Sequence, residues 1–464
     1  MKNYSKIFIF IFGLIALCGC EQKTLTQGGV DDEEDFTIPS GSYIFFNVDN
    51  PTRAALKVGQ LKEAFYVLGY KYTSADGWKA AKAQASQNNT ISFIDYKGAN
   101  ITAPMGVFGL ADRYSEGYNS TTSDNTSDKQ LVEYSNGAHK YSPLQEWEPN
   151  LTYSFFAWYP SDLKVNGEEN SNVNYRTVEG NPYINYSIAE GAGFVGREQM
   201  YDVMTACKID AKKRQGVNVN LEMEHRLSVL DIQAVNIISA VDIKEIWTNE
   251  VAKGGFTTNG GDLATLINGI SEDDKVTVTI NSLTLNLSKL YRKATISLNT
   301  DEATCDYKKN ANGEFVLDAN GQQIKETIIV SDPVSNVNFS FVYGNVNNAE
   351  NDGKIAYYYD LTAAEDARVK QLVNSDKKLI LIPQNEPITA KLTVVYTIEC
   401  NGVSKTYEIP RTEGSVHLKA EATIAKLDEG CHHYLELTFS KNGLFVVAKS
   451  HETWEDFTIR HDFE

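Results

Sequence analysis

The chain has 464 residues, of which 42% are hydrophobic and 22% charged, and its formal net charge is −18. This composition excludes disorder throughout, and the length exceeds what one ordinary hydrophobic core supports, so we expect two folded domains. A surface this acidic repels nucleic acid and anionic lipid headgroups, so neither is expected as a partner.

The chain begins with the features of a secretory signal. Lys2 and Lys6 precede an apolar run over residues 7–17, IFIFIFGLIAL, which small residues and cysteine follow. The run is much shorter than the ~20 apolar residues of a membrane-spanning helix. A signal peptide over residues 1–19 is therefore favoured over a permanent transmembrane anchor.

Cys20 is the predicted site of lipid attachment. Leu17 lies three places before it and Gly19 one place before it, which are the branched aliphatic and small residues that a lipobox requires. Cys18 is the competing acceptor, but it would put the bulky Leu17 in the small position. An ordinary cleaved signal with incidental cysteines is the other alternative. We expect an outer-membrane lipoprotein whose lipid partner is bound through Cys20.

Residues 20–39 are expected to form a lipidated, flexible and acidic tether. They contain few apolar side chains and include the acidic run DDEED at 31–35, a composition that stays solvated. An acidic stretch after a lipidated cysteine is similar to the export signal that sends some lipoproteins to the cell surface, although such signals usually lie nearer the cysteine. The expected location is therefore the outer surface of the cell.

Beyond the tether, apolar residues alternate with a period of two, which is typical of half-buried β-strands. The alternation is clear over residues 44–48, 217–223, 276–280, 392–398 and 435–439. Turn-rich segments separate the strands, among them residues 118–127 and the two Asn-Gly pairs within 310–321. Because no helix recurs between the strands, we expect an all-β protein of antiparallel sandwiches.

Two short helices and one domain boundary complete the prediction. One helix begins at the capping box of Thr362 and Glu365 and ends near Asn374, and the other covers residues 78–86, WKAAKAQAS,. The boundary is expected after the strand pair near 217–236. The predicted domains are an N-terminal sandwich at 40–236 and a C-terminal sandwich at 237–464.

A series of short motifs runs through both halves of the chain. They are WEPNLTYSFFAWYP at 147–160, DVM at 202–204, EHRLS at 224–228, LIPQ at 381–384 and GCHHY at 430–434. Their order resembles that of the fimbrillin-like (Mfa-like) proteins of Bacteroidetes type V pili, which also begin with a lipobox. The resemblance implies two consecutive transthyretin-like β-sandwich domains and a role as subunit, tip or accessory protein of an adhesive surface fimbria. The partners implied are other fimbrial subunits, bound by strand exchange, with a host or bacterial surface ligand as a further candidate.

Arg53 is the candidate site of proteolytic processing. In the family's pilin precursors, as the resemblance implies, a trypsin-like protease cuts after an arginine just past the first strand, and a strand from the next subunit fills the groove left behind. Here residues 41–47 are the predicted first strand, and 51–55, PTRAA, an exposed linker. The alternative is that Arg53 simply belongs to a loop.

Three histidines are candidates for a chemical role. His225 continues the odd-numbered apolar phase of residues 217–223, so its ring should face the core, where a hydrogen-bonded structural role is favoured over a ligand or base. His432 and His433 would point to opposite faces of a strand and cannot share a metal. We interpret that pair as a turn and expect no metal site.

No motif indicates an enzyme or a cofactor. GxSxG, HExxH and phosphate-binding glycine loops do not occur in the sequence, so a hydrolase is only a distant alternative. Isolated buried thiols are favoured over a single disulfide at the four later cysteines, which are widely spaced and form no CxxC pair: Cys207, Cys305, Cys400 and Cys431,.

Two further features leave alternatives open. An aromatic cluster at Trp147, Phe155, Phe156, Trp158 and Tyr159 could stack on a sugar ring, although alternation along this segment favours core packing. Its use as a binding surface defines the alternative function, a monomeric surface glycan-binding lipoprotein. The tail at 450–464 is either a donated strand or the closing strand of the second sandwich, and its imperfect alternation argues against a shaft role.

Overall fold

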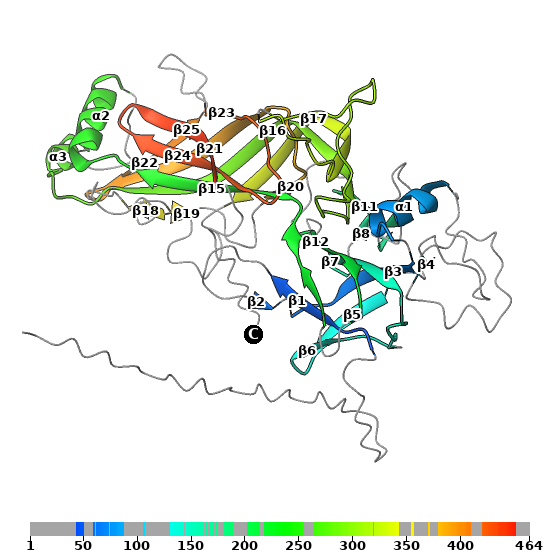
Figure 1. The fold of residues 1–464 in the computed structure, drawn as a ribbon. Helices are drawn as coiled ribbons and strands as arrows, with labels where there is room; N and C mark the ends of the chain where they lie inside the picture. The colour runs from blue at the N-terminus through cyan, green and yellow to red at the C-terminus, as the bar shows by residue number, and fades with distance from the viewer. Residues whose placement is uncertain are drawn as a thin grey trace, which may run out of the picture.

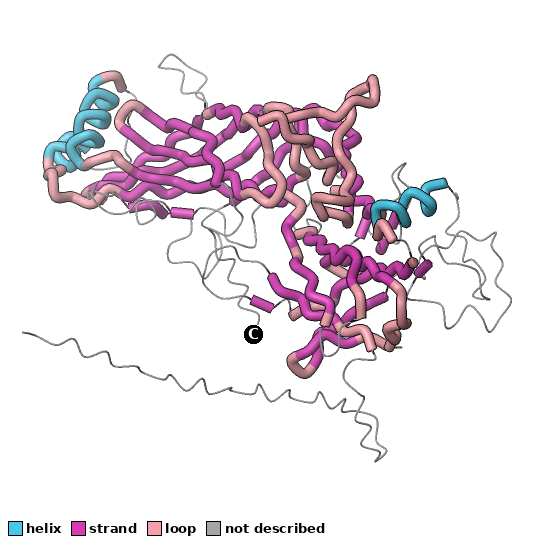
Figure 2. Tube along the Cα trace, viewed as in Figure 1, coloured by secondary structure: helices cyan, strands magenta, loops and turns pink. Residues whose placement is uncertain are grey.

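A computed structural model of the chain shows strands gathered into sheets, with three short helices in the described part (Figure 2). The predicted all-β sandwich fold is confirmed. The structure describes residues 43–50, 59–60, 62–73, 75–87, 105–106, 130–142, 144–161, 164–165, 168–169, 173–174, 181–188, 202–213, 218–254, 256, 263–318, 320–342, 354–356, 370–371, 379–409 and 420–451.

The N-terminal sandwich packs a seven-stranded sheet against a three-stranded one (Figure 1). The larger sheet has the order β14 (Glu224–His225), β12 (Met204–Ala211), β7 (Thr152–Tyr159), β3 (Phe65–Tyr72), β5 (Gln130–Ser135) and β6 (Ala138–Lys140), with β4 (Met105–Gly106) beside β3. The smaller sheet has the order β13 (Val219–Glu222), β1 (Phe46–Asn50) and β2 (Gly59–Gln60).

The C-terminal sandwich packs an eight-stranded sheet against a five-stranded one. The path of the larger sheet is β10 (Val173–Asn174), β11 (Tyr183–Ser187), β16 (Thr277–Ser297), β21 (Ile388–Cys400) and β22 (Val403–Ile409); β17 (Ile328–Val342), β18 (Lys354–Ala356) and β23 (Glu421–Ile424) pair beside it. The smaller sheet has β19 (Lys370–Gln371), β15 (Ser228–Asn236), β24 (His432–Ser440) and β25 (Gly443–His451), with β20 (Leu379–Leu381) next to β15. A separate pair is formed by β8 (Lys164–Val165) and β9 (Glu168–Glu169).

The period-two pattern of the sequence fixes which side chains enter these cores. In β21, Val394, Tyr396 and Ile398 are buried while the residues between them are not, because successive side chains of a strand point to opposite faces. The strands predicted over 44–48, 217–223, 276–280, 392–398 and 435–439 correspond to β1, β13, β16, β21 and β24.

Helices are few, and two of them were not predicted. The helix expected at 78–86 is present as α1 (Trp78–Gln87), whereas α2 (Ala240–Ala252) and α3 (Leu263–Asn268) were missed. Ser239 and Asp242 form a reciprocal capping box at the start of α2, a signal present in the sequence. Of the helix predicted at 362–374, only residues 370–371 lie in the described part, and they form β19. No helix in the described ranges is long and apolar enough to cross a membrane.

Some strands that precede the predicted domain boundary belong to the C-terminal sandwich. β15, which precedes residue 237, runs parallel to β24, and β11 pairs with β16 in the C-terminal sandwich. A third apolar cluster contains side chains of β3 and β7 together with others from β11 and β16. The strand pairing favours a division near residues 226–228 rather than at 236 and 237, with β10 and β11 inserted into the later sheet.

Candidate functional site

The first strand lies in a slot along the N-terminal sandwich, which we call the β1 slot. β1 runs parallel to β13, with Phe46 opposite Val219 and Val48 opposite Leu221, and its other edge pairs with β2. Parallel neighbours cannot be joined by a tight turn. The slot therefore holds β1 through contacts and hydrogen bonds and not through short chain connections to β13.

Main-chain hydrogen bonds anchor the residues that lead into β1. The Ile44 N–H donates to the Gln145 carbonyl at 2.8 Å, and the Val219 N–H donates to the Phe45 carbonyl at 2.8 Å. The Tyr141 hydroxyl donates to the Ile44 carbonyl at 2.7 Å. The strand predicted at 41–47 is thus displaced toward the C-terminus, to Phe46–Asn50, but its backbone is already paired at residue 44.

Alternate side chains of this segment enter the core of the N-terminal sandwich. Ile44, Phe46 and Val48 are 0%, 4% and 0% exposed, and the Phe46 ring lies edge-on to Phe155 with centroids 5.4 Å apart. Asn47, between Phe46 and Val48, points away from the core, and its Nδ2 donates a hydrogen bond to Oδ1 of Asn220. Burial of three large apolar side chains contributes about 5–9 kcal/mol, so side-chain packing is the main force that holds β1.

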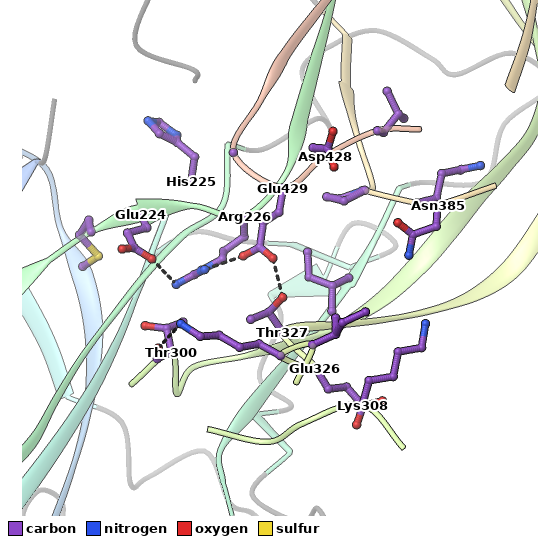
Figure 3. A pocket seen from close by; sticks show the side chains of 18 of the residues that line it. Glu224, His225, Arg226, Thr300, Lys308, Glu326, Thr327, Asn385, Asp428 and Glu429 are labelled. Carbon is purple, nitrogen blue, oxygen red and sulfur yellow. Dashed lines mark hydrogen bonds and ion pairs between the residues drawn. The ribbon is translucent and has the colours of Figure 1, made fainter. Parts of the chain in front are cut away.

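A polar cavity lies where the two sandwiches meet, and we call it the junction cavity (Figure 3). Its volume is about 800 Å³. Arg226 is 4% exposed and donates to Glu224, Glu429 and Thr205, while Glu429 accepts from the hydroxyl of Thr327. Buried charges require partners of this kind, so Arg226 joins the end of one sandwich to loops of the other.

His225 lies at the edge of the junction cavity. Its Nδ1 is 2.9 Å from Asp202 Oδ1, and its side chain is 21% exposed. The hydrogen-bonded structural role that the sequence favoured agrees with this geometry. The expectation that the ring faces the apolar core is wrong, because the Asp202 carboxylate holds the ring at a half-exposed position.

His432 and His433 begin β24 and are both 2% exposed, so the prediction of a turn is wrong. His433 Nε2 accepts the Asp428 N–H at 3.1 Å, and burial lowers the pKa of His433. His432 Nε2 lies 3.8 Å from Asp231 Oδ2 on the neighbouring strand. Among the residues that the structure describes, no group of three or more His, Cys, Asp or Glu residues is placed to hold a metal.

The aromatic cluster is closed to a sugar. Trp147, Phe155, Phe156 and Trp158 are at most 5% exposed, and Phe155 packs into the N-terminal core while Phe156 and Trp158 enter the third cluster. Core packing, the favoured interpretation, is confirmed for these four residues. Tyr159 is half-buried.

All four later cysteines are free thiols in the structure: Cys207, Cys305, Cys400 and Cys431. Burial raises the pKa of Cys400 to about 11, which keeps this thiol protonated and unreactive at neutral pH. The favoured prediction of isolated buried thiols holds for Cys305 and Cys400, whereas Cys207 and Cys431 are free but only partly buried.

The remaining predicted sites lie mostly outside the described residues. The structure does not describe Cys20, the tether or Arg53. In the sequence, Arg53 follows the last residue of β1 by three positions. In the tail, residues up to His451 belong to β25, which pairs with β24 of the same sandwich. Residues 452–464 lie outside the described part.

No protein-family model matches the sequence, and no curated protein matches it. Among solved structures, a fimbrial protein from Bacteroides vulgatus is 15% identical, with a TM-score of 0.46, over 89% of this chain and 99% of that one. The structural neighbours of this chain are fimbrial proteins and putative cell adhesion proteins of Bacteroidetes.

Two of these neighbours are more distant. A putative cell adhesion protein from Bacteroides uniformis is 11% identical, with a TM-score of 0.35, over 89% of this chain and 99% of that one. The C-terminally truncated tip fimbrial protein Mfa3 from Porphyromonas gingivalis is 8% identical, with a TM-score of 0.25, over 88% of this chain and 98% of that one. Similarity of this degree does not assign a function.

Proposed function

We propose that this chain is a structural, adhesive and non-enzymatic component of a surface fimbria, and that subunits assemble by strand donation after export as a lipoprotein. Two observations support the proposal. The ordered motifs of both halves resemble fimbrillin-like proteins. The β1 slot carries the proposal, because it holds an N-terminal strand by alternate buried side chains beside a partner strand distant in sequence.

Cleavage after Arg53 would convert this slot into an acceptor groove. β1 ends at Asn50, so a cut after residue 53 leaves β1 with no covalent link to the rest of the sandwich. Its departure would expose Val219 and Leu221 of β13 together with the inner face of the larger sheet. An unpaired edge with an open apolar groove binds an extended segment that has an apolar residue at every second position.

Processing also decides what the lipid on Cys20 does. If Arg53 is cut, the lipid brings the precursor to the surface and leaves with β1. If Arg53 stays whole, Cys20 anchors the subunit permanently in the outer membrane.

The experiment is N-terminal sequencing of protein recovered from fibres of cells that carry the wild-type chain, Arg53→Gln or Lys57→Gln. Lys57→Gln is the matched control, since Lys57 is the other basic residue in the sequence between β1 and β2. We expect mature wild-type and Lys57→Gln chains to begin at Ala54 and to form heat-labile ladders, and Arg53→Gln to keep its lipid and fail to polymerise. Fibres built from chains that begin well before Ala54 would count decisively against strand donation by this route.

No observation favours the glycan-binding alternative. It depended on the aromatic cluster between residues 147 and 159, and four of the five residues of that cluster are core residues.

A further inference from the structure

In the ribbon view, α1 lies near β11 of the C-terminal sandwich (Figure 1). A cluster of polar side chains is buried where these elements meet. Lys82 lies in α1, Asn181 just before β11, and Asp306 beyond the end of β16; they are 7%, 0% and 5% exposed. A lysine, a primary amide and a carboxylate therefore meet in a place from which water is largely excluded. An amine nucleophile, an amide carbonyl and a carboxylate that can transfer protons are the groups needed to form an amide bond between side chains.

The carboxylate of Asp306 contacts both nitrogen atoms. Its Oδ1 lies 3.4 Å from Lys82 Nζ and accepts a hydrogen bond from Asn181 Nδ2 at 2.7 Å. Both nitrogens also donate to the carbonyl of Thr304, at 2.6 Å from Lys82 and 3.1 Å from Asn181. The Tyr183 hydroxyl donates to the second oxygen of Asp306 at 2.5 Å and fixes the carboxylate in this position. Two shared acceptors place the amine beside the amide.

The amide of Asn181 is also polarised. Its Oδ1 accepts hydrogen bonds from Trp78 Nε1 at 3.0 Å and from Asn299 Nδ2 at 2.7 Å. Two preorganised N–H donors on a carbonyl oxygen stabilise the negative charge that develops there when a nucleophile adds to the carbon. The same bonds determine which end of the side chain is oxygen and turn Nδ2, the leaving group, toward Asp306.

We propose that Lys82 and Asn181 become joined by an intramolecular isopeptide bond, with Asp306 transferring the protons. The Lys82 ammonium gives a proton to Asp306, and the neutral Nζ attacks Cγ of Asn181, whose carbonyl electron pair moves onto Oδ1. Asp306 then protonates Nδ2 and takes a second proton from Nζ. The electron pair on Oδ1 re-forms the carbonyl, the Cγ–Nδ2 bond breaks, and ammonia leaves.

The departing ammonia removes the proton from Asp306, so the products are the isopeptide, an ammonium ion and the original carboxylate. No oxidant or co-reactant is needed. The new bond ties α1, which packs on the N-terminal sandwich, to the chain entering β11 in the C-terminal sandwich. Force pulling the two sandwiches apart would then act on a covalent bond and not only on packing.

Tryptic digestion of the purified full-length chain tests the proposal by mass spectrometry. We expect residues 80–97, uncut after Lys82, to be linked to residues 177–197. The linked species should be lighter than the sum of the two peptides by one ammonia. Recovery of an unmodified peptide that ends at Lys82, together with an intact peptide containing Asn181, would overturn the proposal. A peptide that joins Lys82 to Asp306 with loss of water would also overturn it.

Variants separate the chemistry from folding. Asp306→Asn keeps the shape of the side chain but cannot carry the proton, so we expect the linked peptide to be lost while the circular dichroism spectrum is unchanged. Lys79→Arg is the matched control on an exposed turn of the same helix, and it should keep the link. Should Asp306→Asn fail to fold, the digest of the wild-type chain still decides. A linked peptide in a folded Asp306→Asn chain would refute the role given to Asp306.

Discussion

Truncation of Phe46 tests whether side-chain burial is what holds β1 in its slot. The ring is 4% exposed and lies against Phe155, Tyr141 and Phe65 at centroid distances of 5.4, 5.7 and 6.4 Å. Phe46→Ala loses the transfer free energy of the ring and leaves a cavity that these rigid strands fill poorly. Losses of both kinds together amount to about 3–5 kcal/mol for a buried phenylalanine.

The measurement is urea unfolding of the uncleaved chain, followed by near-ultraviolet circular dichroism. Asn47→Ala is the matched control, because Asn47 is the neighbouring residue of β1 and points to the outer side. Its free energy of unfolding should change by at most about 0.5 kcal/mol. If Phe46→Ala lost less than about 1 kcal/mol, or no more than Asn47→Ala, backbone pairing alone would hold β1 and the argument from packing would be wrong.

Three further changes test other parts of the structure. His433→Gln should flatten the pH dependence of stability, because the pKa of His433 in the folded chain is lowered from 6.5. The stability that neutral His433 contributes is complete above about pH 6.5 and declines as the pH falls toward the folded pKa. Urea denaturation at pH 7.5 and at pH 5 measures the difference. Arg226→Met should cost about 3 kcal/mol, because the Glu429 carboxylate at the junction loses its partner,; Arg226→Lys, which keeps the charge, should lose less in the same urea titration. Ser239→Ala should cost about 1 kcal/mol through loss of the cap of α2,, and an unchanged thermal midpoint would contradict that role.

Much of the strand content could be predicted because alternation is a local property. Val394 and Tyr396 show their burial in the sequence itself, since a strand with one buried face must place apolar residues at every second position. Alternation placed the ring of His225 wrongly, and the interpretation of His432 and His433 as a turn was also wrong. There the side chain is turned or buried by partners elsewhere in the chain, Asp202 for the first and Asp428 for the last.

The helices divide in the same way. The sequence of α1 is rich in alanine, lysine and glutamine, which form helices readily,, and α2 begins with a capping box that is also visible in the sequence. Nothing local could show that β15 pairs with β24, because about 200 residues separate the two strands,. The boundary was therefore predicted after the strand pair near 217–236, whereas the pairing of β15 with β24 favours an earlier position.

The sequence by itself determined the β-sandwich class and the inward phase of most strands, because each depends on residues within one short window. Only the tertiary structure decided which strands are neighbours and which polar groups meet in the interior. Arg226 contacts Glu429, and Lys82 contacts Asp306, although more than 200 residues of sequence separate the members of each pair. Such contacts are set by how whole sheets pack, and burial then makes each partner obligatory because an unpaired charge or amide inside the protein is too costly to keep.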